Sequence, residues 1–144
     1  MDDLQSIKLV FPGEILAHQS VRKSRGGAFY QPKKVQKYKD RIRVDAISQL
    51  TLKFTAWKEM VIIDELTFIF PPIQSLKAVD HARIASGEIV YKQTKPDLTD
   101  NLQKAFIDAL SGVLFKDDNI IVEENCVRKV YGLRPGIIFR ARGK

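Results

Sequence analysis

The segment that most constrains the fold of this 144-residue chain is the run at residues 60–70. It is rich in β-branched and aromatic residues, and two prolines, Pro71 and Pro72, follow it at once. This pattern predicts a strand with a defined end. A shorter run at residues 7–11 is stopped in the same way by Pro12 and Gly13. A β-sheet is therefore part of the expected fold.

Segments with helical spacing of apolar residues alternate with these strands. One apolar stripe runs through residues 32–52, and a second begins at Thr99 or Asp100 and ends at Leu114. The residues expected to be buried on the two helices are Val35, Tyr38, Ile42, Ala46, Ile47 and Leu50, and then Leu102, Ala105, Phe106, Ala109, Leu110 and Val113.

Short extended segments are expected between and after these helices, at residues 28–30, 89–91, 120–122, 126–131 and from 137 on. Residues 74–87 are ambiguous and have room for a short helix. The order of elements predicts the α+β class, with helices packed on a small mixed sheet. The length suits one domain over residues 1–144.

Composition excludes several classes of protein. The single cysteine, Cys126, rules out an intramolecular disulfide framework, and two histidines leave little material for a zinc enzyme. No apolar run approaches the ~18 residues of a membrane span, and the chain starts with Met1-Asp2-Asp3, unlike a secretory signal. We expect a soluble, cytoplasmic protein with no membrane partner and no organic cofactor.

The charges are separated along the chain, which has a formal net charge of +7. Residues 18–43 and 125–144 are strongly basic, whereas residues 97–118 hold five aspartates. Basic arms hold phosphates and an acidic centre holds Mg²⁺ in a metal-dependent nuclease, although charge runs are also often only solvated surface. The candidate DNA-binding residues are Arg22, Lys23, Arg25, Lys33, Lys34, Lys37 and Arg41.

The aspartates fall on both sides of the second predicted helix. Asp97 lies just before the helix, Asp100 lies in its first turn, and Lys104 follows four residues later on the same face, with Asp108 four residues further on. The pair Asp117-Asp118 follows the helix. Two carboxylates ~4 Å apart repel by roughly 4 kcal/mol at a dielectric of 20, which a divalent cation would relieve. Alternatively, each aspartate is only a cap, a turn or a solvated residue.

The motif in residues 95–122 resembles the RusA family of Holliday-junction resolvases, small endodeoxyribonucleases that are common in prophages. The family pattern is roughly Pro-Asp-Leu-Asp-Asn-Leu-x-Lys, then Asp-Ala-Leu and an Asp-Asp pair. The chain has Lys-Pro-Asp-Leu-Thr-Asp-Asn-Leu-Gln-Lys at 95–104, Asp-Ala-Leu at 108–110 and Lys-Asp-Asp-Asn-Ile at 116–120. The resemblance implies a homodimer that binds four-way DNA junctions and makes paired, symmetric, Mg²⁺-dependent nicks in DNA recombination and repair, with Mn²⁺ as a substitute metal.

Position by position, the resemblance implies four catalytic residues: Asp97, Asp100, Lys104 and Asp118. The implied metal ligands are Asp97, Asp100, Asp117 and Asp118. Thr99 departs from the family pattern because it adds a residue between the first two aspartates. A spacing of three needs a bulge or a helical turn to bring both carboxylates to one side.

Two other functions stay open. One is a different Mg²⁺-dependent nuclease that acts on forks, flaps or RNA. The other is a non-catalytic DNA-binding accessory protein whose aspartates merely cap a helix. Lys104 stands among four candidate carboxylate ligands and favours an enzyme, because a fixed positive charge stabilises the transition state of phosphoryl transfer.

Overall fold

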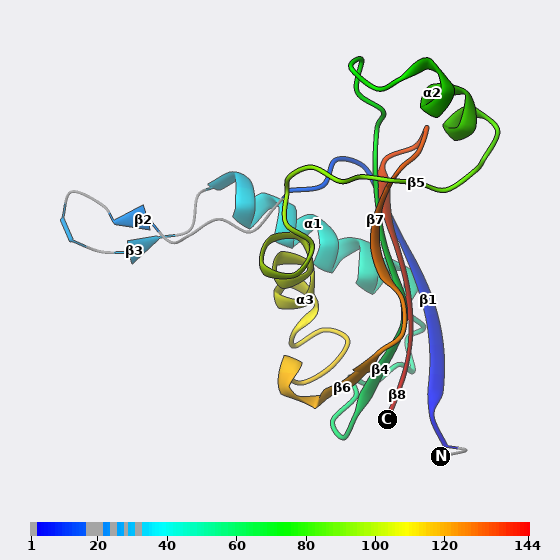
Figure 1. Ribbon diagram of the computed structural model, residues 1–144. Coiled ribbons are helices and arrows are strands. Elements are labelled where there is room, and N and C mark those ends of the chain that lie inside the picture. The colour runs from blue at the N-terminus through cyan, green and yellow to red at the C-terminus, as the bar shows by residue number, and fades with distance from the viewer. Residues whose placement is uncertain (1–2, 17–21, 24–25, 28, 31–32) are drawn as a thin grey trace.

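The computed structural model describes residues 3–16, 22–23, 26–27, 29–30 and 33–144. The main sheet has the strand order β1, β8, β4, β7, β5, with β6 paired to β4 (Figure 1). The strands are β1 (Gln5–Pro12), β4 (Val61–Phe70), β5 (Val90–Tyr91), β6 (Ile121–Glu124), β7 (Val127–Tyr131) and β8 (Gly136–Gly143). A separate ribbon pairs β2 (Arg22–Lys23) with β3 (Phe29–Tyr30).

Strand β4, predicted at residues 60–70, is the centre of the main sheet. It pairs antiparallel with β8 and parallel with β6 and β7, so the sheet is mixed. Both faces of the strand are largely buried, which explains its nearly continuous apolar sequence. The predicted α+β class with a mixed sheet is therefore confirmed.

Helices α1 (Lys33–Gln49) and α3 (Lys104–Leu110) cover one face of the sheet (Figure 1). The core between these layers centres on Phe106 of α3, whose ring lies edge-on to Phe11 of β1 at 5.1 Å and to Phe68 of β4 at 6.1 Å. Phe106 is fully buried. This packing fixes α3, and with it the aspartate motif, against the centre of the sheet.

The second predicted helix differs from the observed one at both ends. A π-helical segment, η1 (Leu98–Gln103), comes first and continues directly into α3, which ends at Leu110 rather than at Leu114. Ser111 already has extended backbone angles and Gly112 has a φ of +86°, so the chain turns there. On α1, Ile47 is 60% exposed and does not join the buried stripe.

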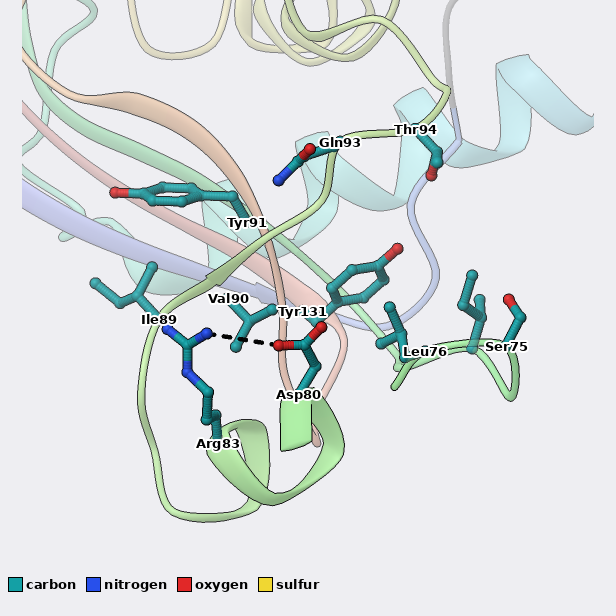
Figure 2. Close-up of a pocket in the computed structure, with 11 residues that line it drawn as sticks. Ser75, Leu76, Asp80, Arg83, Ile89, Val90, Tyr91, Gln93, Thr94 and Tyr131 are labelled. Atoms are coloured by element: carbon teal, nitrogen blue, oxygen red, sulfur yellow. Dashed lines mark hydrogen bonds and ion pairs between the residues drawn. The ribbon is translucent and has the colours of Figure 1, made fainter. Parts of the chain in front are cut away.

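The ambiguous segment at residues 74–87 contains a short helix, α2 (Ala78–Ala85). Its Ile84 packs with Val90 and Tyr131 in a small hydrophobic cluster apart from the main core. A cavity of about 490 Å³ lies between α2 and β5 (Figure 2). From β5 the chain passes along this cavity through Gln93 and Thr94 before it reaches η1.

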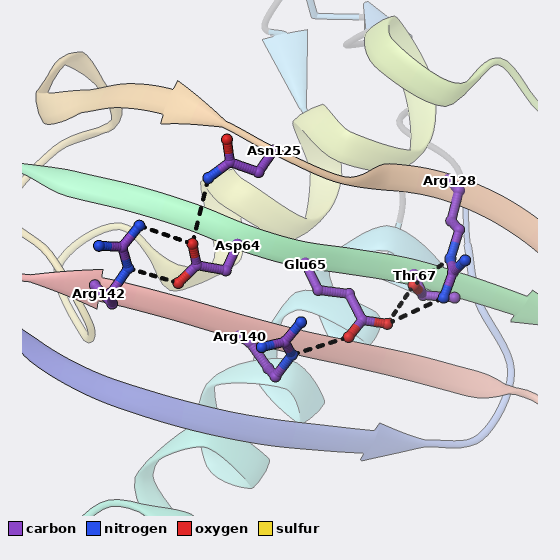
Figure 3. Close-up of polar contacts among 7 residues, drawn as sticks. All are labelled: Asp64, Glu65, Thr67, Asn125, Arg128, Arg140 and Arg142. Atoms are coloured by element: carbon purple, nitrogen blue, oxygen red, sulfur yellow. Dashed lines mark hydrogen bonds and ion pairs between the residues drawn. The ribbon is translucent and has the colours of Figure 1, made fainter.

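The other face of the sheet carries an ion-pair network (Figure 3). Arg142 donates to both oxygens of Asp64 at 2.8 and 3.0 Å, while Glu65 pairs with Arg140 at 3.0 Å and with Arg128 at 3.5 Å. The sequence predicts that the basic residues after position 125 hold phosphates. These three arginines pair with carboxylates of β4 in the structure, and their contact with phosphates stays a prediction.

Within the described ranges, the structure has no helix that is both long enough and apolar enough to cross a bilayer.

Candidate active site

A cavity of about 490 Å³ lies where the two halves of the aspartate motif come together. It is formed by η1, α3, the short 3₁₀ helix η2 (Asp118–Ile120) and the start of β6. Its lining combines cationic, anionic, amide and apolar side chains: Thr99, Gln103, Lys104, Ile107, Asp108, Asp118, Ile121 and Glu124.

Helix α3 presents Lys104 and Asp108 to this cavity from one face. The two residues are four positions apart, so their side chains lie one above the other on the helix. The opposite face is apolar and fully buried, with Phe106 and Leu110 in the core. Core packing therefore sets the direction in which the polar side chains point.

The Asp117-Asp118 pair lies in the turn before β6. The Asp117 carboxylate accepts a hydrogen bond from the backbone N–H of Asp118 at 2.7 Å and so caps η2. A hydrogen bond with the Asp117 carboxyl, then burial, then the negative charges of Asp117 and Asp108 raise the pKa of Asp118. The neighbouring carboxyls thus disfavour the ionised form of Asp118.

Asp108 lines the cavity, and the sequence placed it on one polar face with Lys104, with a solvated residue as the alternative. Its carboxylate lies 3.8 Å from the ammonium group of Lys39, a lysine of α1 that is only 9% exposed. The spacing of four residues between Lys104 and Asp108 is the sequence feature that places both side chains on one face of the helix. The contact with Lys39 spans 69 positions of the chain, and no local pattern predicts it.

Glu124 and Gln103 are further members of the cavity that the sequence did not single out. The Gln103 side-chain amide donates a hydrogen bond to the Glu124 carboxylate, which joins η1 to the end of β6. This bond closes one side of the cavity. Strand β6 carries Glu124 there because it pairs with β4, a long-range contact.

Asp97 and Asp100 are exposed, and neither is among the described residues that line this cavity. Asp97 precedes η1, and its carbonyl accepts a hydrogen bond from the N–H of Leu102 at 3.0 Å, a five-residue step. A single inserted residue is accommodated in a helix by such a π turn. The extra Thr99 is therefore absorbed by a helical turn, one of the two geometries expected for it.

The predicted group of four converging carboxylates is not assembled in the part of the chain that the structure describes. No set of three or more His, Cys, Asp or Glu side chains lies there in a metal-binding arrangement. Mg²⁺, however, is usually held by one or two carboxylates, several waters and the substrate phosphate. The adjacent carboxyls of Asp117 and Asp118 fit such an ion, since a hydrogen bond with Asp117, then burial, then the charges of Asp117 and Asp108 raise the pKa of Asp118.

The predicted DNA-binding residues divide into three groups. The side chains of Arg22 and Lys23, and all of Arg25, lie outside the described part of the chain. The following α1 lysines are exposed: Lys33, Lys34 and Lys37.

Arg41 is the exception on α1. Its guanidinium donates to the carbonyl of Glu14 at 2.5 Å and lies over the Tyr38 ring at 5.3 Å. Arg41 therefore ties the segment after β1 to α1, and its role in binding phosphate stays a prediction.

Comparison with known families decides the class of this protein. The family model of Endodeoxyribonuclease RusA matches residues 12–141. The chain belongs to the RusA endodeoxyribonuclease family. The RusA match covers α1, both halves of the aspartate motif and the sheet apart from most of β1 and the end of β8, so the resemblance noted in residues 95–122 extends to nearly the whole chain. No curated protein matches the chain.

Proposed function

We propose that this RusA family member resolves Holliday junctions by paired, symmetric nicks in DNA recombination and repair. The observation that carries the proposal is the cavity in which Lys104 and Asp118, from the two halves of the family motif, lie together with Asp108. A cation and carboxylates at one solvent-accessible site suit phosphodiester hydrolysis. The whole chain, residues 1–144, acts as one endonuclease domain in this proposal.

In the proposed reaction, the catalytic residues are Asp97, Asp100, Lys104 and Asp118. Lys104 binds the scissile phosphate and stabilises the negative charge that develops on its oxygens. Asp118 orients the attacking water, and Asp108 holds that carboxylate in an electronegative environment. The buried side of α3 packs in the core and so fixes the direction of Lys104 and Asp108 on the opposite side.

The carboxylates proposed to hold Mg²⁺, or Mn²⁺ in its place, are Asp118 and Asp117 together with Asp97 and Asp100. When bound, the metal lowers the pKa of a coordinated water and neutralises charge on the phosphate. Asp97 and Asp100 lie on either side of Thr99 at the entry to η1. Their contribution is therefore expected to require the bound DNA, since they do not line the cavity in the free protein.

We propose that the active form is a homodimer. A four-way junction has approximate twofold symmetry, and its resolution needs two matched cuts. A pair of chains related by a twofold axis supplies two identical sites. Size-exclusion chromatography with light scattering on the purified protein tests this directly, and a purely monomeric mass at micromolar concentration would contradict it.

The decisive assay offers the purified protein a mobile four-way junction, a fork, a flap, a duplex and a structured RNA, each with millimolar Mg²⁺. Symmetric paired nicks confined to the junction support the proposal. Cuts only on the fork, flap or RNA would instead indicate a different Mg²⁺-dependent nuclease. Junction binding without any cut would indicate an accessory DNA-binding protein.

The substitution Asp118→Asn tests the site itself. We expect nicking to fall at least ~10²-fold because a carboxylate that acts on the water is lost, while junction affinity stays within about twofold. The matched control is Asp45→Asn on α1, outside the cavity. Nicking by Asp118→Asn at the wild-type rate would show that the site is assigned wrongly.

A further inference from the structure

The chain enters the aspartate motif through a loop that is held by one lysine of the sheet. Lys129 of β7 donates a hydrogen bond from Nζ to the carbonyl of Thr94 at 2.6 Å and another to the carbonyl of Pro96 at 2.8 Å. The two carbonyls lie two residues apart, and Asp97 follows Pro96 directly. A single ammonium group thus binds both ends of a three-residue segment at the edge of the motif.

The side chain of Lys129 reaches this loop because of its place in the sheet. Lys129 is the register partner of Phe68, whose ring contacts Phe106 of α3, so Lys129 points to the face that the helices cover. Its neighbour Arg128 points to the other face and pairs with Glu65. Strand alternation therefore aims Lys129 toward the entry to η1.

The backbone around Lys129 reinforces the same contact. The carbonyl of Lys129 accepts a hydrogen bond from the N–H of Lys92 at 3.0 Å, and the Lys92 ammonium group donates to Thr94 Oγ1 at 2.9 Å. The loop is thus attached to β7 at both of its ends. Hydrogen bonds from an ammonium group to a carbonyl are charge-assisted and stronger than neutral ones.

We infer that Lys129 is a positioning residue for the nuclease reaction, which holds the segment 94–96 so that Asp97 and η1 are presented correctly beside the cavity. The inference rests on the proposed function, since it assigns Asp97 to the reacting site. Lys129 itself lies outside the lining of the cavity. It acts through the loop rather than on DNA.

The test compares Lys129→Met, which keeps the length of the side chain and removes the donors, with Lys129→Arg, which keeps a cation. We expect Lys129→Met to lower kcat for junction nicking about 10²-fold, the loss that a small misplacement of a reacting group causes. KM for the junction is expected to stay within twofold, and Lys129→Arg to recover part of kcat. Lys53→Met, an exposed lysine in the loop after α1, is the control for the lost charge.

Amide hydrogen exchange gives a second readout that does not depend on activity. In Lys129→Met the backbone amides of residues 94, 95 and 97–101 are expected to exchange at least tenfold faster, while those of β4 keep the wild-type rate. Uniformly faster exchange would mean a general structural role and would overturn the inference. Unchanged exchange at 94–101 would overturn it as well.

Chemical restoration of the ammonium group completes the design. In a Cys126→Ser background, which removes the single native cysteine, Lys129→Cys is alkylated with 2-bromoethylamine to give an ammonium side chain of lysine length. Recovery of kcat and of slow exchange supports the inference, and failure to recover either one contradicts it. If the wild-type protein nicks no substrate, the proposed function fails, whereas the exchange data still decide whether Lys129 orders the loop.

Discussion

Asp64 and Glu65 are neighbours in the chain, yet both carboxylates lie on the same face of the sheet. Strand alternation would send them to opposite faces. The register of β4 against β8 shifts between Ile63 and Glu65, so Asp64 is the extra residue of a β-bulge. Each carboxylate then meets its own arginine of β8, Arg142 or Arg140 (Figure 3).

These pairs make stability depend on pH. The hydrogen bond from Arg142 lowers the pKa of Asp64, and hydrogen bonds from Thr67 and Arg140 outweigh the effect of burial and lower that of Glu65. A lowered pKa in the folded state stabilises the fold above the unfolded value of about 3.9 for Asp. That stabilisation is lost as the pH falls through the folded pKa.

Asp64→Asn is therefore expected to lower the free energy of unfolding by about 1 kcal/mol at pH 7, in the range measured for well-aligned but partly exposed pairs. The difference from wild type should shrink as the pH falls below the unfolded value and through the lowered pKa of folded Asp64. Urea denaturation at pH 7, 5, 4 and 3 measures it. A difference that stays constant across this range would contradict the ion-pair account.

At the same scale, the sequence predicts some site residues and misses others for a physical reason. Lys104 and Asp118 belong to one local motif; Lys104 begins α3 and Asp118 begins η2, and both line the cavity. Lys39 and Lys129 reach the site region only through contacts with distant segments. Such contacts depend on the packing of helix on sheet, which side-chain spacing alone does not contain.

Among the elements, η1 is where local pattern and structure differ most. Periodicity predicts one regular helix, and the structure has a π turn followed by a short α-helix. The inserted Thr99 accounts for the π turn, while Gly112 with its positive φ accounts for the early end of α3. The buried stripe of α3 was predicted correctly, because Ala105, Phe106, Ala109 and Leu110 are all fully buried.

Deletion of Thr99 tests the role of the π turn. Removing one residue rotates everything before it by about 100° relative to α3, so Asp97 should face a different direction while Lys104 stays in place. We expect the melting temperature to stay close to that of wild type and the nicking rate to fall at least tenfold. Thr99→Ala is the matched control, since it keeps the chain length. Equal nicking by the deletion variant, which has the family spacing of the two aspartates, would show that the π turn is not needed for the reaction.

The molecule has a net charge of +7, but some of its cationic side chains are paired with carboxylates, so the basic residues differ in how readily they can bind an anionic ligand. The arginines of β7 and β8 are compensated by Asp64 and Glu65 on the outer face of the sheet. The exposed lysines Lys33, Lys34 and Lys37 belong to α1, which covers the same face of the sheet as α3 (Figure 1). Composition predicts a polyanion as partner, but only the structure shows which cations are left for it.

The salt dependence of junction binding distinguishes these two sets of cations. Each phosphate contact contributes a slope of about −0.9 to the plot of log K against log salt concentration. Replacing Lys33, Lys34 and Lys37 together by alanine should reduce the slope by about 2 to 3. The double variant Arg140→Ala, Arg142→Ala should leave the slope unchanged. Fluorescence anisotropy of a labelled junction between 50 and 300 mM salt measures both, and a reversed result would contradict the assignment.

Strand β8 lies between β1 and β4 and pairs with both. During translation, β1 and β4 therefore leave the ribosome long before the strand that joins them, and the nascent chain carries two open apolar edges until residues 136–143 appear. Pairing over such sequence separations is intrinsically slow and leaves the chain prone to association in the meantime. A chain that stops at residue 135 has β1 and β4 but lacks β8, and is therefore expected to associate rather than to fold.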